Sequence, residues 1–196
     1  MTHTYDAYKR PTSGQKTYTL KAKSWKQIFQ TNRQGKKARV ATLISDKIDF
    51  KNRGIKRDPE SHFIILKGRI YQEDINIVNI YVLNIGEPKY KRKILEDCKK
   101  DIDSNTIILG DFNTPLSKMD RSSKQNINKD IVALNNVLDE MDLTDTCRAF
   151  HPKEAKYTFF SNALGIFSKI DHMRGQASTN SSKLKSYQAF SLTTRD

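Results

Sequence analysis

The stretch Thr106-Ile107-Ile108-Leu109-Gly110-Asp111-Phe112-Asn113 decides the fold expected of this chain. Its first four residues form a short apolar run, which is typical of a buried strand. The polar residues that follow therefore lie where a buried strand emerges at the edge of a sheet. Active sites of layered α/β folds commonly gather at such strand ends. The stretch thus predicts a layered α/β fold with a candidate site at this strand end.

The spacing of side chains within this stretch suits hydrolysis of a phosphodiester. Asp111 and Asn113 are two residues apart, so on a strand they face the same side, while Phe112 points into the core. Gly110 leaves room for the close approach of a ligand. A carboxylate can orient or deprotonate water, and an amide N–H can donate to a phosphoryl oxygen. The alternative is a turn that Asp111 and Asn113 close with their side chains.

Upstream of this stretch, apolar runs predict three strands. Residues 62–70 and 75–82 are two apolar strands joined by the short polar turn 72–74, so we expect them to form a hairpin. Residues 37–45 form a β-branched run of strand length. Residues 47–60 are charged and contain a glycine and a proline, which favours a connection over a strand.

Two amphipathic helices are expected further along the chain. The first opens at Pro88, and its apolar residues recur at helical spacing, with Cys98 as a small core residue on the buried stripe. The second covers residues 130–141. Two more strands, 157–161 and 167–171, flank a short loop, and the pattern then fades. Paired strands and separated helices predict mixed α/β packing in which helices cover sheet faces.

The net charge favours a polyanionic partner. The 196 residues include 35 Lys and Arg against 22 Asp and Glu, which gives a formal net charge of +13. Residues 1–60 alone hold 15 Lys and Arg against 5 Asp and Glu. Such a basic segment favours nucleic acid, or less often an anionic membrane surface, as the partner. The alternative is that the charge serves solubility.

The composition excludes several classes of protein. There is no run of about 18 apolar residues, so we expect no transmembrane helix. The first residues lack an apolar stretch, so no secretory signal is expected. Two cysteines, Cys98 and Cys147, are too few for a disulfide scaffold or a four-cysteine zinc site. With no disulfide partner expected, a reducing, intracellular compartment is the default.

Two further positions are candidates for chemistry. Tyr81 ends an apolar strand and Asn84 starts the turn after it, and a tyrosine there can donate to a phosphate, although it is more often a rim aromatic. Asp171 ends a strand and can fix the tautomer of a catalytic histidine. His172 cannot be that histidine, because adjacent strand residues point to opposite faces. The remaining histidines are expected to have structural or surface roles: His3, His62 and His151.

The order of these motifs resembles the endonuclease/exonuclease/phosphatase superfamily. Further segments between residues 20 and 171 resemble the apurinic-type endonuclease domain of a mammalian long interspersed (LINE) retrotransposon polyprotein. They are Trp25-Lys26-Gln27-Ile28-Phe29, Lys36-Lys37-Ala38, Val40-Ala41, Ile44-Ser45-Asp46-Lys47, Ile55-Lys56-Arg57-Asp58, Gly110-Asp111-Phe112-Asn113-Thr114-Pro115-Leu116, Asp120-Arg121-Ser122, Tyr157-Thr158-Phe159-Phe160-Ser161 and Lys169-Ile170-Asp171.

The resemblance implies a four-layered α/β/β/α sandwich, the DNase-I-like fold, in which two packed sheets carry helices outside. Enzymes of this family nick DNA with Mg²⁺. By resemblance Asp111 would orient the attacking water and is the nearest candidate for a metal ligand. Asn113 and Tyr81 would contact the scissile phosphate, and Asp171 would orient the catalytic histidine. The resemblance places further residues at the DNA: Asn84, Arg121, Thr158 with the hairpin loop after it, and Lys169.

The sequence departs from the family pattern at both ends. The family has an Asn on its first strand and then a metal-binding Glu just before Thr-His, whereas this chain begins Met1-Thr2-His3. The family ends with Ser-Asp-His on a late strand, and residues 173–196 hold no histidine and no Ser-Asp pair. We therefore expect a lead-in over residues 1–19, an incomplete domain over 20–172 and a divergent, weakly ordered tail over 173–196.

These departures predict a loss of catalysis. Catalytic residues that act as a unit are non-additive, so losing the metal-binding Glu and the histidine removes most of the rate. We expect a monomeric, retrotransposon-derived relic that binds DNA without sequence preference and with strong salt sensitivity, in the nucleus if it functions as in the family. The alternatives are an active Mg²⁺-dependent DNA endonuclease and a chain without a stable fold or function.

Overall fold

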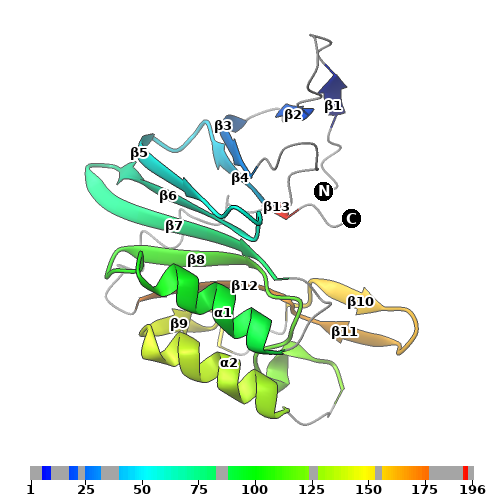
Figure 1. The fold of residues 1–196 in the computed structure, drawn as a ribbon. Coiled ribbons are helices and arrows are strands. Elements are labelled where there is room, and N and C mark those ends of the chain that lie inside the picture. The colour runs from blue at the N-terminus through cyan, green and yellow to red at the C-terminus, as the bar shows by residue number, and fades with distance from the viewer. Residues whose placement is uncertain are drawn as a thin grey trace.

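A six-stranded sheet forms the centre of the molecule. The computed structural model describes residues 6–9, 18–21, 25–31, 40–82, 88–123, 128–152, 156–176 and 192–193. The strands of this sheet, in spatial order, are β5 (Phe50–Arg57), β6 (Phe63–Ile70), β7 (Glu73–Tyr81), β8 (Thr106–Asp111), β12 (Asp171–Gln176) and β9 (Leu143–Asp145). Neighbouring strands are antiparallel except β7 and β8, which run parallel (Figure 1). The predicted hairpin over residues 62–82 is confirmed by β6 and β7.

A smaller sheet packs against one face of the six-stranded sheet. It consists of β13 (Leu192–Thr193), β4 (Val40–Ser45) and β3 (Trp25–Gln30), in that order. Val40 and Ile44 of β4 are buried in a core cluster with apolar residues of β6, β7 and β8. The buried Asn79 of β7 reaches across, and its Nδ2 donates to the Ala41 carbonyl at 3.0 Å. Both sheets therefore share one apolar interface.

Two helices, α1 (Pro88–Lys99) and α2 (Lys129–Glu140), cover the opposite face of the six-stranded sheet (Figure 1). Leu95 and Cys98 of α1 and Leu138 of α2 pack with Phe112 in a second core cluster, in which all four side chains are fully buried. This confirms Cys98 as a core residue and the inward direction of Phe112. The described residues thus form three of the four predicted layers, and among them no helix covers the outer face of the smaller sheet.

The predicted connection over residues 47–60 is wrong, because its central part forms β5 at the edge of the larger sheet. Phe50 and Ile55 face the core, while most of the other side chains of β5 lie exposed. The register of β5 against β6 shifts between Asn52 and Gly54, which is a bulge. An edge strand tolerates charged residues and a bulge, which also discourage pairing with a further chain. The charges that suggested a connection belong to the exposed face of this edge.

The pattern was also expected to fade from His172 onward, whereas Asp171–Gln176 forms β12 in the interior of the larger sheet. His172 and Arg174 are polar but buried, and both find partners far away in the sequence. The Arg174 Nη1 donates to the Leu143 carbonyl at 3.1 Å. A strand whose inward residues are polar has no apolar alternation, so the hydropathy pattern does not reveal it.

The remaining elements are short. A hairpin of β10 (Phe159–Ser161) and β11 (Ile166–Ser168) confirms the two strands expected around a loop. A second pair, β1 (Asp6–Lys9) and β2 (Tyr18–Lys21), begins inside the expected lead-in. A 3-10 turn, η1 (Lys118–Asp120), and α3 (Thr146–Phe150) complete the description. None of the helices described is both long enough and apolar enough to cross a membrane.

Candidate functional site

Three predicted residues lie in a row at the ends of adjacent strands. Tyr81 of β7 is the register partner of Asp111 of β8, and Asp111 is in turn the partner of Asp171 of β12. Residues paired across neighbouring strands present their side chains on the same face of a sheet. This face is the one toward the smaller sheet, because Tyr81 packs against the cluster that contains Val40 and Ile44. We call Tyr81, Asp111 and Asp171 the strand-end row.

The fourth predicted residue, Asn113, lies in a tight turn directly after the row. It adopts a positive φ of 47°, and its backbone N–H donates to Asp111 Oδ1 at 2.8 Å. Its Nδ2 donates to the Val82 carbonyl at 2.6 Å. The structure therefore contains the turn that the alternative predicted, closed by the side chains of Asp111 and Asn113. The turn does not exclude chemistry, because it fixes one carboxylate oxygen of Asp111 and ties the ends of β7 and β8 together.

The sequence predicts that Gly110 leaves room for a ligand. In the structure this glycine instead allows β7 and β8 to pack closely. Its φ is +141°, and a Cβ at this position would collide with the backbone of Ile80 in β7. Only glycine adopts this conformation without strain. The close approach that glycine permits is thus between two strands, and it brings the ends of β7 and β8 into register at the row.

Lys91 is a cation near the row that sequence reasoning missed. Its Nζ donates to the Asn113 carbonyl at 3.4 Å, and its side chain is half-buried. Burial lowers the pKa of Lys91, while the negative charge of Asp111 acts in the opposite direction. In the sequence Lys91 is one member of a run of cations on α1, and no local signal separates it from the others. Only the fold brings it to the turn.

Thr158 and Arg121 connect the hairpin to the strand that carries Asp171. The Thr158 hydroxyl accepts from the backbone N–H of Ile170 at 3.1 Å and of Asp171 at 3.2 Å. Arg121 pairs through its backbone with Ser168 of β11. Thr158 therefore contacts the backbone of Asp171 directly, and Arg121 lies beside the hairpin strand that leads to Asp171. The predicted Asn84 lies outside the described residues.

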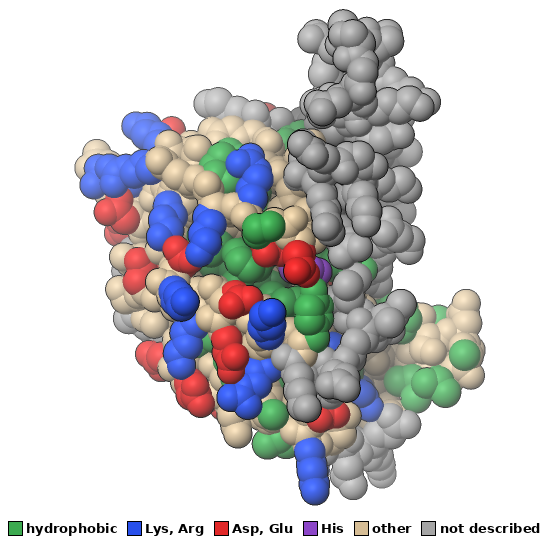
Figure 2. Space-filling model, viewed as in Figure 1, with side chains coloured by type: hydrophobic (Ala, Val, Ile, Leu, Met, Phe, Trp, Pro, Cys, Tyr) green, Lys and Arg blue, Asp and Glu red, His purple; other side chains and the backbone are tan. Residues whose placement is uncertain are grey.

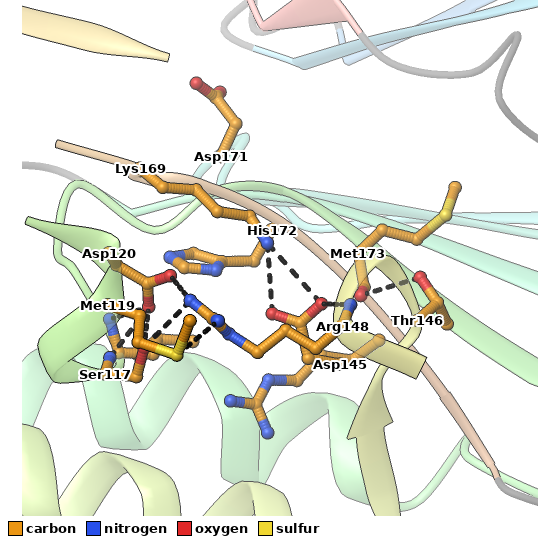
Figure 3. Close-up of polar contacts among 12 residues, drawn as sticks. Ser117, Met119, Asp120, Asp145, Thr146, Arg148, Lys169, Asp171, His172 and Met173 are labelled. Atoms are coloured by element: carbon orange, nitrogen blue, oxygen red, sulfur yellow. Dashed lines mark hydrogen bonds and ion pairs between the residues drawn. The ribbon is translucent and has the colours of Figure 1, made fainter. Parts of the chain in front are cut away.

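Lys169 lies on the other side of the sheet from Asp171. Its side chain is 9% exposed, and its Nζ pairs with Asp145 at 3.1 Å. Figure 3 shows Asp171 directed away from this pair and from the neighbouring Asp120 and Arg148. The predicted DNA contact of Lys169 has no support in this geometry, because a buried ammonium that is already paired with a carboxylate cannot reach a phosphate.

His172 faces the helices, as the alternation along a strand predicts. Its Nε2 donates to the Thr114 carbonyl at 3.0 Å, and its ring meets Phe112 edge-on with centroids 5.4 Å apart. Burial lowers the pKa of His172 to about 4, against the attraction of the nearby Asp120. The imidazole is therefore neutral at pH 7 and serves to hold the turn that follows Asn113.

A buried ion pair fixes the chain downstream of that turn. Asp120 is 1% exposed, and its Oδ1 accepts from Arg148 Nη2 at 2.7 Å (Figure 3). Its Oδ2 accepts from the backbone N–H groups of Leu116 and Ser117 and from the Ser117 hydroxyl. Burial is the largest influence and acts to raise the pKa of Asp120, but the hydrogen bonds from Arg148 and Ser117 and the nearby charges together outweigh it, so the pKa lies below its usual value. The Ser-x-x-Asp spacing of residues 117–120 is the sequence signal for this contact.

The hairpin carries exposed aromatic side chains. Phe160 is 44% and Phe167 48% exposed, and their rings pack with centroids 4.5 Å apart. Figure 2 shows hydrophobic side chains on this hairpin, which projects at the right of the view. Lys and Arg side chains are spread over the visible face with Asp and Glu among them.

Two carboxylates of the row, Asp111 and Asp171, have the chemistry that Mg²⁺ prefers. Mg²⁺ is commonly held by one or two carboxylates together with water and substrate phosphate oxygens. Within the described part of the chain, no group of three or more His, Cys, Asp or Glu side chains could hold a metal ion. The described residues therefore show no complete metal site, and the two carboxylates of the row are the candidates for holding an ion.

Comparisons with known proteins support the fold. No family model matches the chain. The endonuclease domain of TRAS1, a telomere-specific non-LTR retrotransposon, is similar with a TM-score of 0.53 and 18% identity over 77% of this chain and 67% of that one. The AP endonuclease LMAP from Leishmania major is similar with a TM-score of 0.55 and 12% sequence identity, over 79% of this chain and 62% of that one. D. rerio TDP2 complexed with a single-strand DNA product is similar with a TM-score of 0.53 and 12% sequence identity, over 80% of this chain and 64% of that one.

This chain thus spans about two thirds of the length of the TRAS1 domain and slightly less than two thirds of the length of LMAP and of D. rerio TDP2. It is structurally similar to enzymes of the endonuclease/exonuclease/phosphatase superfamily at low sequence identity. Likeness at this level of identity concerns the fold, and the chemistry has to be argued from the residues.

Proposed function

We propose that this chain is a retrotransposon-derived endonuclease-like domain that binds DNA and whose phosphodiester cleavage is impaired. The observation that carries the proposal is the strand-end row, in which Tyr81, Asp111 and Asp171 share one face at the ends of three adjacent strands. The turn at Asn113 follows the row directly. A fold used by DNA-processing enzymes and a row of such residues together favour a phosphodiester as the ancestral substrate.

The row supports defined roles in such a reaction. Asp111 is the residue proposed to orient a water against a phosphorus atom, and the Asn113 N–H fixes the position of its carboxylate. Tyr81 can donate its hydroxyl to a phosphoryl oxygen, and the second N–H of the Asn113 amide can do the same. Lys91 adds positive charge at the turn. A Mg²⁺ held by Asp111 and Asp171 would supply further stabilisation of phosphate charge when bound.

Two observations support impaired cleavage, one on the phosphate-contacting amide and one on the histidine that would act as the base. One of the two amide donors of Asn113 is already engaged with the Val82 carbonyl. The histidine next to Asp171, His172, faces the other side of the sheet and is neutral at pH 7. Since the parts of a catalytic unit are non-additive, a weak base and a partly engaged Asn113 amide slow cleavage together.

The basic composition supports DNA as the partner. A net charge of +13 favours polyanions, and Arg121 and Thr158 lie where the hairpin joins the strand of Asp171. Binding that depends on phosphate contacts weakens steeply with salt and has little sequence preference. We propose that the domain acts as a monomer, and in the nucleus if chromosomal DNA is its partner.

A nicking assay tests the proposal. Supercoiled plasmid is incubated with Mg²⁺ and either the wild-type protein or Asp111→Ala, and duplex binding is measured in parallel at low and moderate salt. We expect little difference in nicking between the two proteins and clear, salt-sensitive binding by both. Much faster nicking by the wild type favours the alternative of an active endonuclease. Absence of a cooperative thermal transition favours the alternative of a chain without a stable fold.

A further inference from the structure

Exposed cations of β5 and β6 lie together on one face of the larger sheet. Ile65, Lys67 and Arg69 are spaced two residues apart along β6, so they share the face on which Ile65 packs with α1 and α2. Lys56 of β5 is the register partner of Ile65 and lies on the same face. Arg53 lies in the bulge of β5 and contacts the same carboxylate as Arg69. We call Arg53, Lys56, Lys67 and Arg69, whose side chains are 42–52% exposed, the β5–β6 strip.

Asp74 holds the two arginines of the strip together. Its Oδ1 accepts from Arg53 Nη1 at 3.0 Å and from Arg69 Nε at 2.7 Å. One carboxylate shared by two guanidinium groups leaves one positive charge in excess. A guanidinium has five N–H donors, so a single bond to Asp74 leaves most donors of each arginine available to a further acceptor. Planar guanidinium groups bind phosphate oxygens with two parallel hydrogen bonds.

Asp101 bridges the two lysines of the strip in the same way. Its Oδ2 accepts from Lys56 Nζ at 2.5 Å, and its Oδ1 accepts from Lys67 Nζ at 3.1 Å. The Asp101 side chain is 15% exposed, whereas both lysine side chains are about half exposed, so the bridge presents its positive charge outward. The neighbouring Lys51 pairs with Asp49 at 3.7 Å and leaves this excess unchanged. The two bridges therefore hold two excess positive charges in defined positions.

The strip is remote from the strand-end row. Arg69 is the register partner of Asp74 near the start of β7, and Tyr81 ends the same strand. At about 3.4 Å per residue, Asp74 and Tyr81 lie about 24 Å apart along β7. The strip faces the side of α1, whereas the row faces the smaller sheet. In Figure 2 Lys and Arg side chains gather at the upper left, where β5 and β6 lie in Figure 1. A short duplex at the row therefore leaves the strip open.

We propose that the β5–β6 strip binds the phosphate backbone of a second DNA duplex, so that one domain bridges two duplexes. The inference rests on the proposed function for the first of these contacts, the duplex at the strand-end row. Phosphates recur at regular intervals along a duplex, so both carboxylate bridges can be occupied together. The carboxylates already restrict the four cationic side chains, which reduces the entropy lost on binding. Contacts to phosphate alone make this second binding sensitive to salt and independent of sequence.

The number of duplexes bound per protein tests the strip. A short fluorescent hairpin duplex in excess is mixed at low salt with the wild type or with Arg53→Gln/Arg69→Gln, and sedimentation velocity gives the stoichiometry. The matched control is Lys118→Gln/Lys129→Gln, which removes the same charge from exposed positions on η1 and α2. We expect two duplexes on the wild type and on the control, and one on the strip variant. Exposed ion pairs contribute at most about 1 kcal/mol, so the strip variant should still unfold cooperatively.

A capture experiment tests the bridge itself. The protein is bound to an immobilised duplex, and a second, fluorescent duplex is then added. We expect the wild type and the control to retain the fluorescent duplex, whereas the strip variant stays on the immobilised duplex and loses the second one.

The outcomes separate this inference from the proposed function. One duplex per wild-type protein, with unchanged binding by the strip variant, would overturn the inference and leave the proposed function intact. Loss of all DNA binding in the strip variant would overturn the row as a DNA site, and absence of binding by the wild type would overturn both. Displacement of the second duplex by polyglutamate more readily than by unlabelled duplex of equal charge would instead assign the strip to an acidic peptide.

Discussion

Removing Arg148 should destabilise the protein through the charge that it leaves behind. In Arg148→Met the aliphatic bulk is kept, but Asp120 loses the partner of its Oδ1 while its Oδ2 retains three neutral donors. Breaking a buried pair costs about 3–5 kcal/mol. Because the side chain of Arg148 is 23% exposed, water can partly replace it, and we expect about 3 kcal/mol. For a protein of this size that lowers Tm by roughly 6–12 °C.

The measurement is thermal and urea unfolding of the wild type, Arg148→Met, Asp120→Asn and the double variant. If the cost is an uncompensated charge, the double variant should be more stable than Arg148→Met, since replacing both partners removes the buried charge. The depressed pKa of Asp120 means that the pair stabilises the fold above the usual carboxyl pKa and that this contribution is lost as pH falls through the folded value. A loss below about 1 kcal/mol at pH 7, or additive single changes, would refute this reasoning.

Three other expectations concern stability. Burial lowers the pKa of His172 to about 4, so between pH 6.5 and about 4 the unfolded chain binds a proton that the folded chain does not bind. The free energy of unfolding, measured with urea, should therefore fall as pH falls through this window. The fall should be smaller in His172→Gln. Gly110→Ala should cost roughly 2 kcal/mol or more in the same assay, because its φ of +141° and the Ile80 backbone both oppose a Cβ. Phe112→Ala should cost about 3–5 kcal/mol. The exposed Phe160→Ala should shift Tm far less, and an equal shift would contradict the burial argument.

The central strand and its flanking elements were predictable because their apolar residues are consecutive or recur with a regular period. Residues 107–109 are apolar and buried, and α2 carries its buried residues on one stripe, so the sequence indicated both elements. Phe112 and Cys98 were correctly expected in the core for the same reason. Local pattern is sufficient where burial depends on hydrophobicity alone.

Elements stabilised by long-range polar contacts were not predictable. The strand β12 buries His172 and Arg174, whose partners are the carbonyls of Thr114 and Leu143. The sequence of β12 alone therefore reads as polar and irregular. Likewise β5 is charged because it lies at an edge, where charge is favourable.

The candidate site shows the same division. The residues of the strand-end row were identified individually from strand ends and from a resemblance, but only the register of β7, β8 and β12 shows that they share one face. Lys91 is one of several cations on α1, and only its contact with the Asn113 carbonyl distinguishes it.

The most direct test of the proposed site asks whether DNA crosses the strand-end row. Without metal, a carboxylate about 5 Å from a phosphate repels it by about 0.8 kcal/mol in water, and Asp111 is buried, so this value is a lower bound for it. The affinity of Asp111→Asn/Asp171→Asn for a labelled duplex, measured by fluorescence anisotropy in EDTA at low salt, should therefore exceed that of the wild type by roughly tenfold. The matched control is Glu96→Gln/Glu140→Gln, which removes the same charge from the exposed surface of α1 and α2. We predict a clearly larger gain for the row pair, and equal gains for both pairs would contradict a DNA path over Tyr81, Asp111 and Asp171.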